Sequence, residues 1–308
     1  MIDYPKIVFM GTPEFAVASL QALVENEFFV ATVVTAPDKP AGRGLKYRES
    51  AVKQYALQKN IPVLQPDKLR DPAFLEQLKL INADIQVVVA FRMLPVQVWA
   101  MPPLGTINLH GSLLPQYRGA APINRAIMNG ETVTGVTTFK LQQEIDTGNI
   151  LLTEKISIGP DEDAGSLHDR MKEIGARLVV QTVQGLANGI LTGKPQLTPD
   201  TASLKMAPKI FATDCEIKWN DSVEKIHNQI RGLSPFPGAF TMFNNKTLKI
   251  FKSHFEKNKL AVEKGKLETD GKNWLRFSAG DGFIYVEELQ AEGKKRMPVK
   301  DFLRGYRP

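Results

Sequence analysis

Hydrophobic positions in the first two thirds of the chain form short apolar runs separated by longer amphipathic stretches. The runs predict strands at 6–10, 30–35, 61–64, 85–90, 106–109, 135–141 and 150–156. The stretches predict helices at about 14–24, 49–59, 71–81 and 163–188. Alternating strands and helices are typical of βαβ units. We therefore expect an α/β, Rossmann-like, mostly parallel sheet with helices on both faces.

The pattern changes after about residue 209. One helix is expected at 221–231, and the other apolar runs are short, at 239–243, 248–251, 274–277 and 283–286. Turn residues separate these runs, as in a small β-barrel of the OB-like type. Glycines and prolines between 189 and 208 indicate a linker. We expect a first domain at 1–189, a linker at 190–208 and a β-barrel domain at 209–308.

Composition excludes several classes of protein. Of the 308 residues, 43% are hydrophobic and 23% charged, which is usual for a soluble globular protein. No apolar run is long enough to span a membrane, and the first residues lack the pattern of a signal peptide. Cys215 is the single cysteine, so an internal disulfide or a CxxC motif is excluded. The expected location is the cytoplasm.

Positive charge is concentrated in two places. Residues 1–203 hold 19 Lys and Arg against 20 Asp and Glu, whereas residues 204–308 hold 20 against 13. A net charge of +7 in the last third favours a polyanionic partner, although a solvated lysine-rich surface has the same composition. The segment 37–48 is a second basic cluster, rich in Pro and Gly and without a strand period, so we expect an exposed loop.

The turn after the first strand argues against a nucleotide cofactor. Its sequence is Gly11-Thr12-Pro13-Glu14, whereas a pyrophosphate-binding turn has the pattern GxGxxG. Pro13 has no N–H to offer a phosphate, and Glu14 would repel one. An NAD- or FAD-dependent oxidoreductase is therefore disfavoured.

The candidate chemistry lies at Asn108, His110 and Asp146. Asn108 and His110 end a predicted strand and are two residues apart, so their side chains point the same way. Ligands of parallel sheets bind at the carboxyl ends of strands. Each residue alone has an ordinary interpretation: a structural histidine, a turn-forming asparagine and an Asx turn. Together they are a plausible acid–base and oxyanion-stabilising set.

The residues around this set resemble a known family. Asn108-x-His110, then Ser112-Leu113-Leu114-Pro115-x-x-Arg118-Gly119 and later Asp146-Thr147-Gly148, is similar to the signature of the folate-dependent formyltransferases. Further stretches, at 9–16, 40–44, 65–70, 230–239 and 293–297, are similar to members that act on methionyl initiator tRNA. The chain departs from the usual family pattern at 90–93, at Ala51 and at Thr137-Thr138.

The resemblance implies an activity and a role for each group of residues. The donor would be 10-formyltetrahydrofolate, the acceptor the α-amino group of methionyl initiator tRNA, and the product N-formylmethionyl-tRNA for translation initiation. Asn108, His110 and Asp146 would be catalytic, with Asp146 orienting His110. The folate site would include Ser112, Leu113, Leu114 and Pro115. Contacts to tRNA would come from Arg43, Lys39, Lys46 and Arg48. No metal is implied, and a monomer is expected.

Two rival functions share part of this pattern. A sugar N-formyltransferase would have the same catalytic set but would not account for the basic segment 37–48 or the basic last third. A nucleic-acid-binding module with an inactive first domain would account for the charge. It would not account for the joint presence of Asn108, His110 and Asp146.

Overall fold

The computed structural model describes residues 5–41, 46–197, 203–258 and 263–305. These residues form two compact units, which are interleaved along the chain. The first unit comprises the described residues of 1–119, 135–156 and 169–206, and the second comprises those of 120–134, 157–168 and 207–308. The domain boundaries that we expected at 189 and 209 stay a prediction.

The first unit is built on a seven-stranded sheet with the order β10-β9-β7-β6-β1-β2-β5. Its strands are β1 (Ile7–Gly11), β2 (Val30–Val34), β5 (Val63–Leu64), β6 (Ile85–Val89), β7 (Thr106–His110), β9 (Val133–Lys140) and β10 (Ile150–Ser157). The pairs β1–β2, β1–β6, β2–β5 and β6–β7 are parallel, whereas β7–β9 is antiparallel. The predicted mixed α/β architecture with a largely parallel sheet is confirmed.

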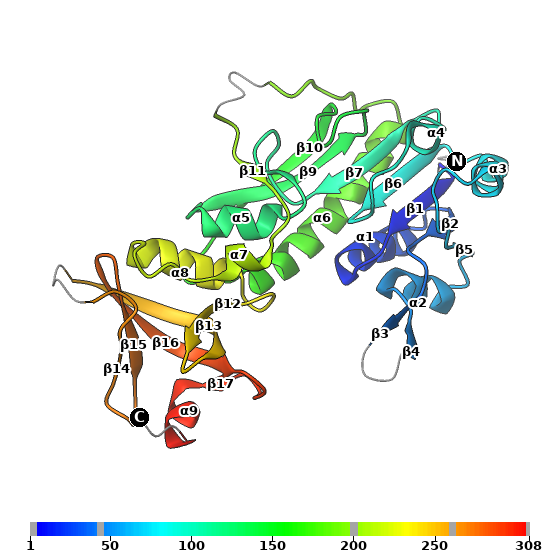
Figure 1. The fold of residues 1–308 in the computed structure, drawn as a ribbon. Coiled ribbons are helices and arrows are strands. Elements are labelled where there is room, and N and C mark those ends of the chain that lie inside the picture. The colour runs from blue at the N-terminus through cyan, green and yellow to red at the C-terminus, as the bar shows by residue number, and fades with distance from the viewer. Residues whose placement is uncertain (1–4, 42–45, 198–202, 259–262, 306–308) are drawn as a thin grey trace. The chain divides into compact units, whose positions relative to one another are not determined.

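Helices lie on both faces of this sheet (Figure 1). They are α1 (Glu14–Glu25), α2 (Ala51–Gln58), α3 (Pro72–Ile81), α4 (Val96–Trp99) and α6 (Ala164–Ala187). Side chains of α3 and α4 share one apolar cluster with Val8, Met10 and Val88 of the central strands. Alternate residues of a strand point to opposite faces. One face of each central strand therefore supports α3 and α4, and the other face supports different helices.

The basic segment 37–48 contains two short strands, at residues 39–41 and 46–48, that its sequence did not predict. Strands β3 (Lys39–Ala41) and β4 (Lys46–Arg48) form an antiparallel hairpin in which Lys39 is paired with Arg48. Our expectation of a loop without strands was wrong for residues 39–41 and 46–48. The sequence pattern did not predict these strands because each has only three residues, too few to show a period of two.

The second unit contains an antiparallel, curled sheet with the order β12-β13-β16-β15-β14 and with β17 paired to β16. Its strands are β12 (Ala239–Phe243), β13 (Lys246–Lys257), β14 (Leu267–Thr269), β15 (Leu275–Ala279), β16 (Gly282–Ala291) and β17 (Met297–Pro298). The helices of this unit are α5 (Pro122–Met128), α7 (Ala212–Cys215), α8 (Val223–Gly232) and α9 (Val299–Gly305). Apart from these two sheets, β8 (Arg118–Gly119) pairs with β11 (Met206–Ala207). A separate antiparallel sheet is thus confirmed, and its OB-like character stays a prediction.

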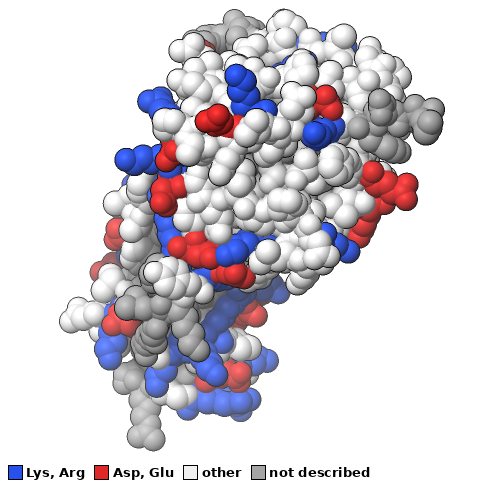
Figure 2. All heavy atoms as spheres, turned by 90° about the vertical axis from the view of Figure 1, so that its right-hand side faces the viewer, with Lys and Arg blue, Asp and Glu red and all other residues white. Residues whose placement is uncertain are grey.

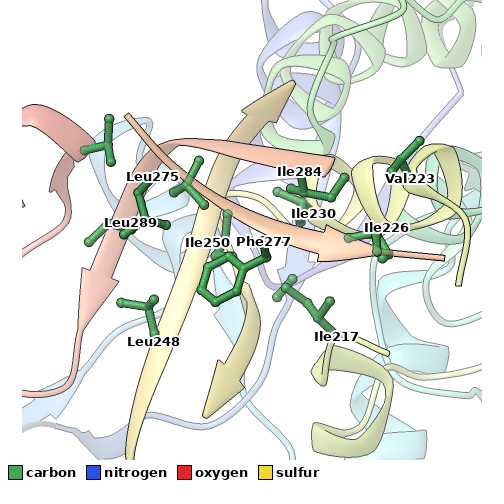
Figure 3. Packing of buried hydrophobic residues seen from close by; sticks show 14 of the residues in the cluster. Ile217, Val223, Ile226, Ile230, Leu248, Ile250, Leu275, Phe277, Ile284 and Leu289 are labelled. Carbon is green, nitrogen blue, oxygen red and sulfur yellow. The ribbon is translucent and has the colours of Figure 1, made fainter. Parts of the chain in front are cut away.

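The core of the second unit joins α8 to this sheet. Val223, Ile226 and Ile230 recur at helical spacing and are fully or almost fully buried. Figure 3 shows them beside apolar side chains of β15 and β16, including Phe277 and Ile284. Ser222 caps the helix by accepting a hydrogen bond from the N–H of Lys225 at 3.3 Å.

Within the described residues, no helix combines the length and the apolar character that a membrane span requires.

Candidate active site

Strand β7 presents Asn108 and His110 on one face of the sheet. Asn108 is paired with Val88 of β6 and with Phe139 of β9, and His110 is paired with Thr137. Leu109, between them, points to the other face and packs on α6, where a Cβ added to Gly175 would lie 2.7 Å from Leu109 Cδ2. The two polar side chains therefore lie side by side, at the end of the strand where parallel sheets bind ligands.

His110 is buried and held by a backbone carbonyl. Its Nε2 lies 2.8 Å from the carbonyl oxygen of Tyr117, and only 6% of the residue is exposed. A carbonyl oxygen can only accept, so Nε2 carries a proton and donates it to this bond. In the neutral ring Nδ1 then has no proton and offers a lone pair.

Asp146 lies opposite that lone pair. Its Oδ2 is 3.8 Å from His110 Nδ1, which is beyond hydrogen-bond range. The same Oδ2 accepts the N–H of Gly119 at 2.9 Å. Asp146 has a φ of 54°, the left-handed region that Asp tolerates better than most residues. Thus the hydrogen bond that fixes the imidazole comes from Tyr117, and Asp146 faces the other ring nitrogen.

Tyr117 and Gly119 are site residues that the sequence did not reveal. Both act through main-chain atoms, a carbonyl and an N–H, which any residue type possesses. The one indication in the sequence was that both residues lie in the family signature that follows His110. Tyr117 also has a left-handed φ of 59°, which is unusual for a bulky residue.

Asn108 differs from its two neighbours because its amide is unengaged. The side chain is half-buried, and it makes no hydrogen bond to any residue in the part of the chain that the structure describes. An asparagine amide has two N–H donors and one acceptor. These groups are therefore available to a bound molecule at the end of β7.

The predicted folate residues form a tight loop after β7. Ser112 is fully buried, and its hydroxyl donates to the carbonyl of Gln116 at 2.6 Å. Thr137 of β9 donates to the Ser112 carbonyl at 2.6 Å and accepts the Leu114 N–H at 3.2 Å. Thr137, which departs from the usual family pattern, therefore stabilises this loop through two hydrogen bonds. Ser112 and the buried Leu114 shape it, whereas Leu113 and Pro115 are partly exposed.

Arg92, in the departure at 90–93, follows β6, the strand beside β7. Its guanidinium donates to the carbonyl of Asp67 at 2.8 Å and to that of Pro66. Next to it is an open pocket of about 270 Å³. Its lining residues are Leu69, Arg70, Arg92, Met93, Leu94 and Pro95. Arginine at this position thus ties the end of β6 to the segment before α3.

The base of the β3–β4 hairpin is fixed by Lys53 of α2. Its ammonium forms ion pairs with Asp38, just before β3, and with Glu49, just after β4. The distance from Lys53 Nζ to Glu49 Oε1 is 3.0 Å. Gln65 also donates to Asp38, at 2.8 Å. The bond from Lys53 and then that from Gln65 lower the pKa of Asp38, and the two carboxylates raise the pKa of Lys53.

Only some of the predicted tRNA contacts can be placed. Lys39 and Arg48 are exposed across the hairpin from each other. Arg43 lies outside the described residues, and so does the side chain of Lys46. On the face drawn in Figure 2, Lys and Arg side chains gather mainly in the lower part of the view, and the upper part is mostly uncharged.

No group of three or more His, Cys, Asp or Glu in the described ranges is arranged to hold a metal ion. The one cysteine, Cys215, is buried, and desolvation raises the pKa of its thiol. Neither observation adds a residue to the site at the end of β7.

The sequence matches two family models, formyl transferase over residues 5–183 and formyl transferase, C-terminal domain, over residues 209–307. The chain belongs to the formyl transferase family. The methionyl-tRNA formyltransferase of Bacteroides fragilis is 49% identical over 307 residues, which cover 98% of this chain and 95% of the relative. That of Parabacteroides distasonis is 50% identical over 310 residues, with 98% and 96% covered. The resemblance found in the sequence is confirmed.

Among solved formyl transferases, the N-formyltransferase of Helicobacter canadensis, in complex with folinic acid and dTDP-3-aminofucose, has a TM-score of 0.68 to this chain. Its sequence is 22% identical, and the match covers 95% of this chain and 100% of that one. At this identity the likeness shows that the two proteins share a fold. It does not decide between a tRNA amine and a sugar amine.

Proposed function

We propose that the protein transfers the formyl group of 10-formyltetrahydrofolate to the α-amino group of methionyl initiator tRNA. The observation that carries this proposal is an identity of 49–50% along nearly the whole chain to relatives named methionyl-tRNA formyltransferase. The product, N-formylmethionyl-tRNA, serves translation initiation. The proposal includes a monomeric chain in the cytoplasm, the compartment where a lone cysteine stays reduced.

In the proposed reaction the amine nitrogen forms a bond to the formyl carbon, and the bond from that carbon to the folate nitrogen breaks. Negative charge gathers on the formyl oxygen as the carbon becomes tetrahedral. Donors already aimed at that oxygen lower the barrier more than any other single device. The unengaged amide of Asn108 supplies such donors without first having to break a bond within the protein.

The attacking amine must also lose a proton, which finally moves to the folate nitrogen. His110 Nδ1 has a lone pair because Nε2 is committed to Tyr117, and Asp146 lies 3.8 Å away. A contraction of about 1 Å would close this gap to a hydrogen bond, as commonly happens when a substrate binds. The carboxylate of Asp146 then stabilises the proton that His110 accepts, directly or through water.

The partly exposed Leu113 and Pro115 provide apolar contacts for the folate in this proposal, on a loop held by Ser112 and Thr137. The hairpin residues Lys39 and Arg48, together with Arg43 and Lys46, bind tRNA phosphates. The second unit, with an excess of Lys and Arg over residues 204–308, is an OB-like tRNA-binding domain. Phosphate neutralisation by these residues makes tRNA affinity dependent on salt.

The test compares two acceptors with the purified chain and 10-formyltetrahydrofolate. Methionyl initiator tRNA should yield formylmethionyl-tRNA, and a nucleotide-linked amino sugar should not be formylated at a comparable rate. Asp146→Asn should lower kcat by about 10²- to 10⁴-fold, the usual contribution of an acid–base group. Glu144→Gln, in the same turn, is the matched control and should retain full activity. Formylation of the amino sugar alone would refute the proposed acceptor.

A further inference from the structure

Gln196 lies in the segment that the sequence marked as a linker, yet its side chain contacts the turn that carries Asp146. Its amide nitrogen donates to the carbonyl of Asp146 at 2.8 Å and to that of Gly148 at 2.8 Å. The backbone beside it is fixed as well, because Lys194 and Ile150 exchange two hydrogen bonds of 2.8 Å each. Both protons of the Gln196 amide are therefore used to hold this turn.

Arg118 determines which way the Gln196 amide points. Its Nε and one terminal nitrogen donate to Gln196 Oε1 at 3.2 and 2.5 Å. A guanidinium can only donate, so the oxygen of the amide must face Arg118 and the NH₂ group must face the two carbonyls. The positive charge of Arg118 also polarises the amide and strengthens its N–H donors.

The next residue, Gly119, holds the other end of Asp146. Its N–H donates to Asp146 Oδ2 at 2.9 Å. Asp146 is thus held at its main-chain carbonyl by Gln196 and at its carboxylate by Gly119. Since Arg118 and Gly119 are adjacent, one short stretch of chain directs both contacts. The turn needs such support because Asp146 is in the left-handed region.

We propose that Gln196 is a positioning residue for the reaction, which holds the Asp146 turn so that the carboxylate faces His110 Nδ1. This inference rests on the proposed formyl transfer, in which Asp146 and His110 act on the amine proton. Gln196 itself does not touch the reacting atoms. Its substitution should therefore affect the chemical step and leave substrate binding largely unchanged.

The experiment measures kcat and KM of formyl transfer to methionyl initiator tRNA for three variants of the full chain. Gln196→Leu removes the donors and the acceptor, and Gln196→Glu keeps an acceptor for Arg118 but removes the donors. The matched control is Gln229→Leu, because the Gln229 amide also donates to two carbonyls, those of Asp214 and Glu216, at 2.9 and 3.0 Å. Thermal melting gives the folded fraction to which each rate is normalised.

Both Gln196 variants should lose about 10- to 100-fold in kcat with little change in either KM, since a displacement of about 1 Å in a reacting group can cost about 100-fold. Gln229→Leu should keep the wild-type kcat. In an Asp146→Asn background, Gln196→Leu should cause almost no additional loss, because the group that it positions is already disabled.

Three results would overturn the inference. The first is a wild-type kcat, per folded molecule, in Gln196→Leu or Gln196→Glu. The second is a loss equal to that of Gln229→Leu, which would indicate a general structural role. The third is a double variant, Gln196→Leu with Asp146→Asn, whose fold loss in kcat equals the product of the two single losses. A wild-type chain that makes no formylmethionyl-tRNA would instead refute the proposed function, and the inference would fall with it.

Discussion

Thr137→Val tests whether one buried hydroxyl holds the loop after β7. The substitution keeps the shape of the side chain but removes the oxygen that donates to the Ser112 carbonyl at 2.6 Å and accepts the Leu114 N–H at 3.2 Å. Thr137 is fully buried. Water therefore cannot replace the hydroxyl unless the loop moves, and both backbone groups lose their partner.

The expected magnitude follows from these two groups. A buried polar group left without a partner costs about 1–3 kcal/mol, so the pair costs about 2–6 kcal/mol. This is a large share of the roughly 5–15 kcal/mol that stabilise a typical domain. For a unit of this size each kcal/mol lowers Tm by about 2–4 °C, so we expect a decrease of at least about 4 °C.

Thr137→Ser is the matched control, because it keeps the hydroxyl and removes one methyl group, at a cost of about 1 kcal/mol. Differential scanning calorimetry of wild type and both variants gives the melting transitions. The KM for 10-formyltetrahydrofolate reports the state of the loop, and it should rise in Thr137→Val more than in Thr137→Ser. If Thr137→Val is as stable as Thr137→Ser and keeps the wild-type KM, the hydroxyl does not hold the loop.

Three further predictions concern other parts of the molecule. Gly148→Ala should lower kcat about tenfold or more, because its Cβ would lie 1.6 Å from the carbonyl oxygen of Lys140 and would displace the Asp146 turn; wild-type turnover would contradict this. Changing Lys39 and Arg48 to Gln should reduce the slope of log Kd for tRNA against log salt by about 1 per residue; an unchanged slope in a filter-binding titration would exclude phosphate contacts. Burial, and then the charge of Arg231, lower the pKa of His227 below its ordinary 6.5. The unfolded chain therefore takes up a proton that the folded chain resists, and stability present above pH 6.5 is lost as the pH falls below it; the Tm of wild type should decrease on acidification to about pH 5.5, and that of His227→Gln should decrease less.

Periodicity alone located most of the elements. The long runs and amphipathic stretches predicted β1, β2, β6 and β7 and the helices α1, α3 and α6 to within a few residues. These elements are found because burial on a sheet or a helix face imposes a period that several residues share. The hairpin of β3 and β4 was missed, and so was the seven-residue α5, because short elements do not repeat the pattern. Strands β13 and β16 were predicted too short, since polar residues that are exposed in β13 and partly buried in β16 interrupt the apolar run toward the ends of these strands.

The sequence by itself predicted the family, which the comparisons confirm. It also predicted the reaction and the candidate site residues Asn108, His110 and Asp146, because these predictions depend on residue types at fixed spacing. Tertiary structure decided how His110 and Asp146 are held and left the Asn108 amide unengaged. Tyr117 and Gly119 act through a carbonyl and an N–H, which every residue carries and no sequence pattern marks. Gln196 lies 50 positions beyond Asp146, and only the folded chain brings its amide against that turn. Residue types specify which groups can react, whereas tertiary contacts between segments far apart in the sequence decide where those groups point.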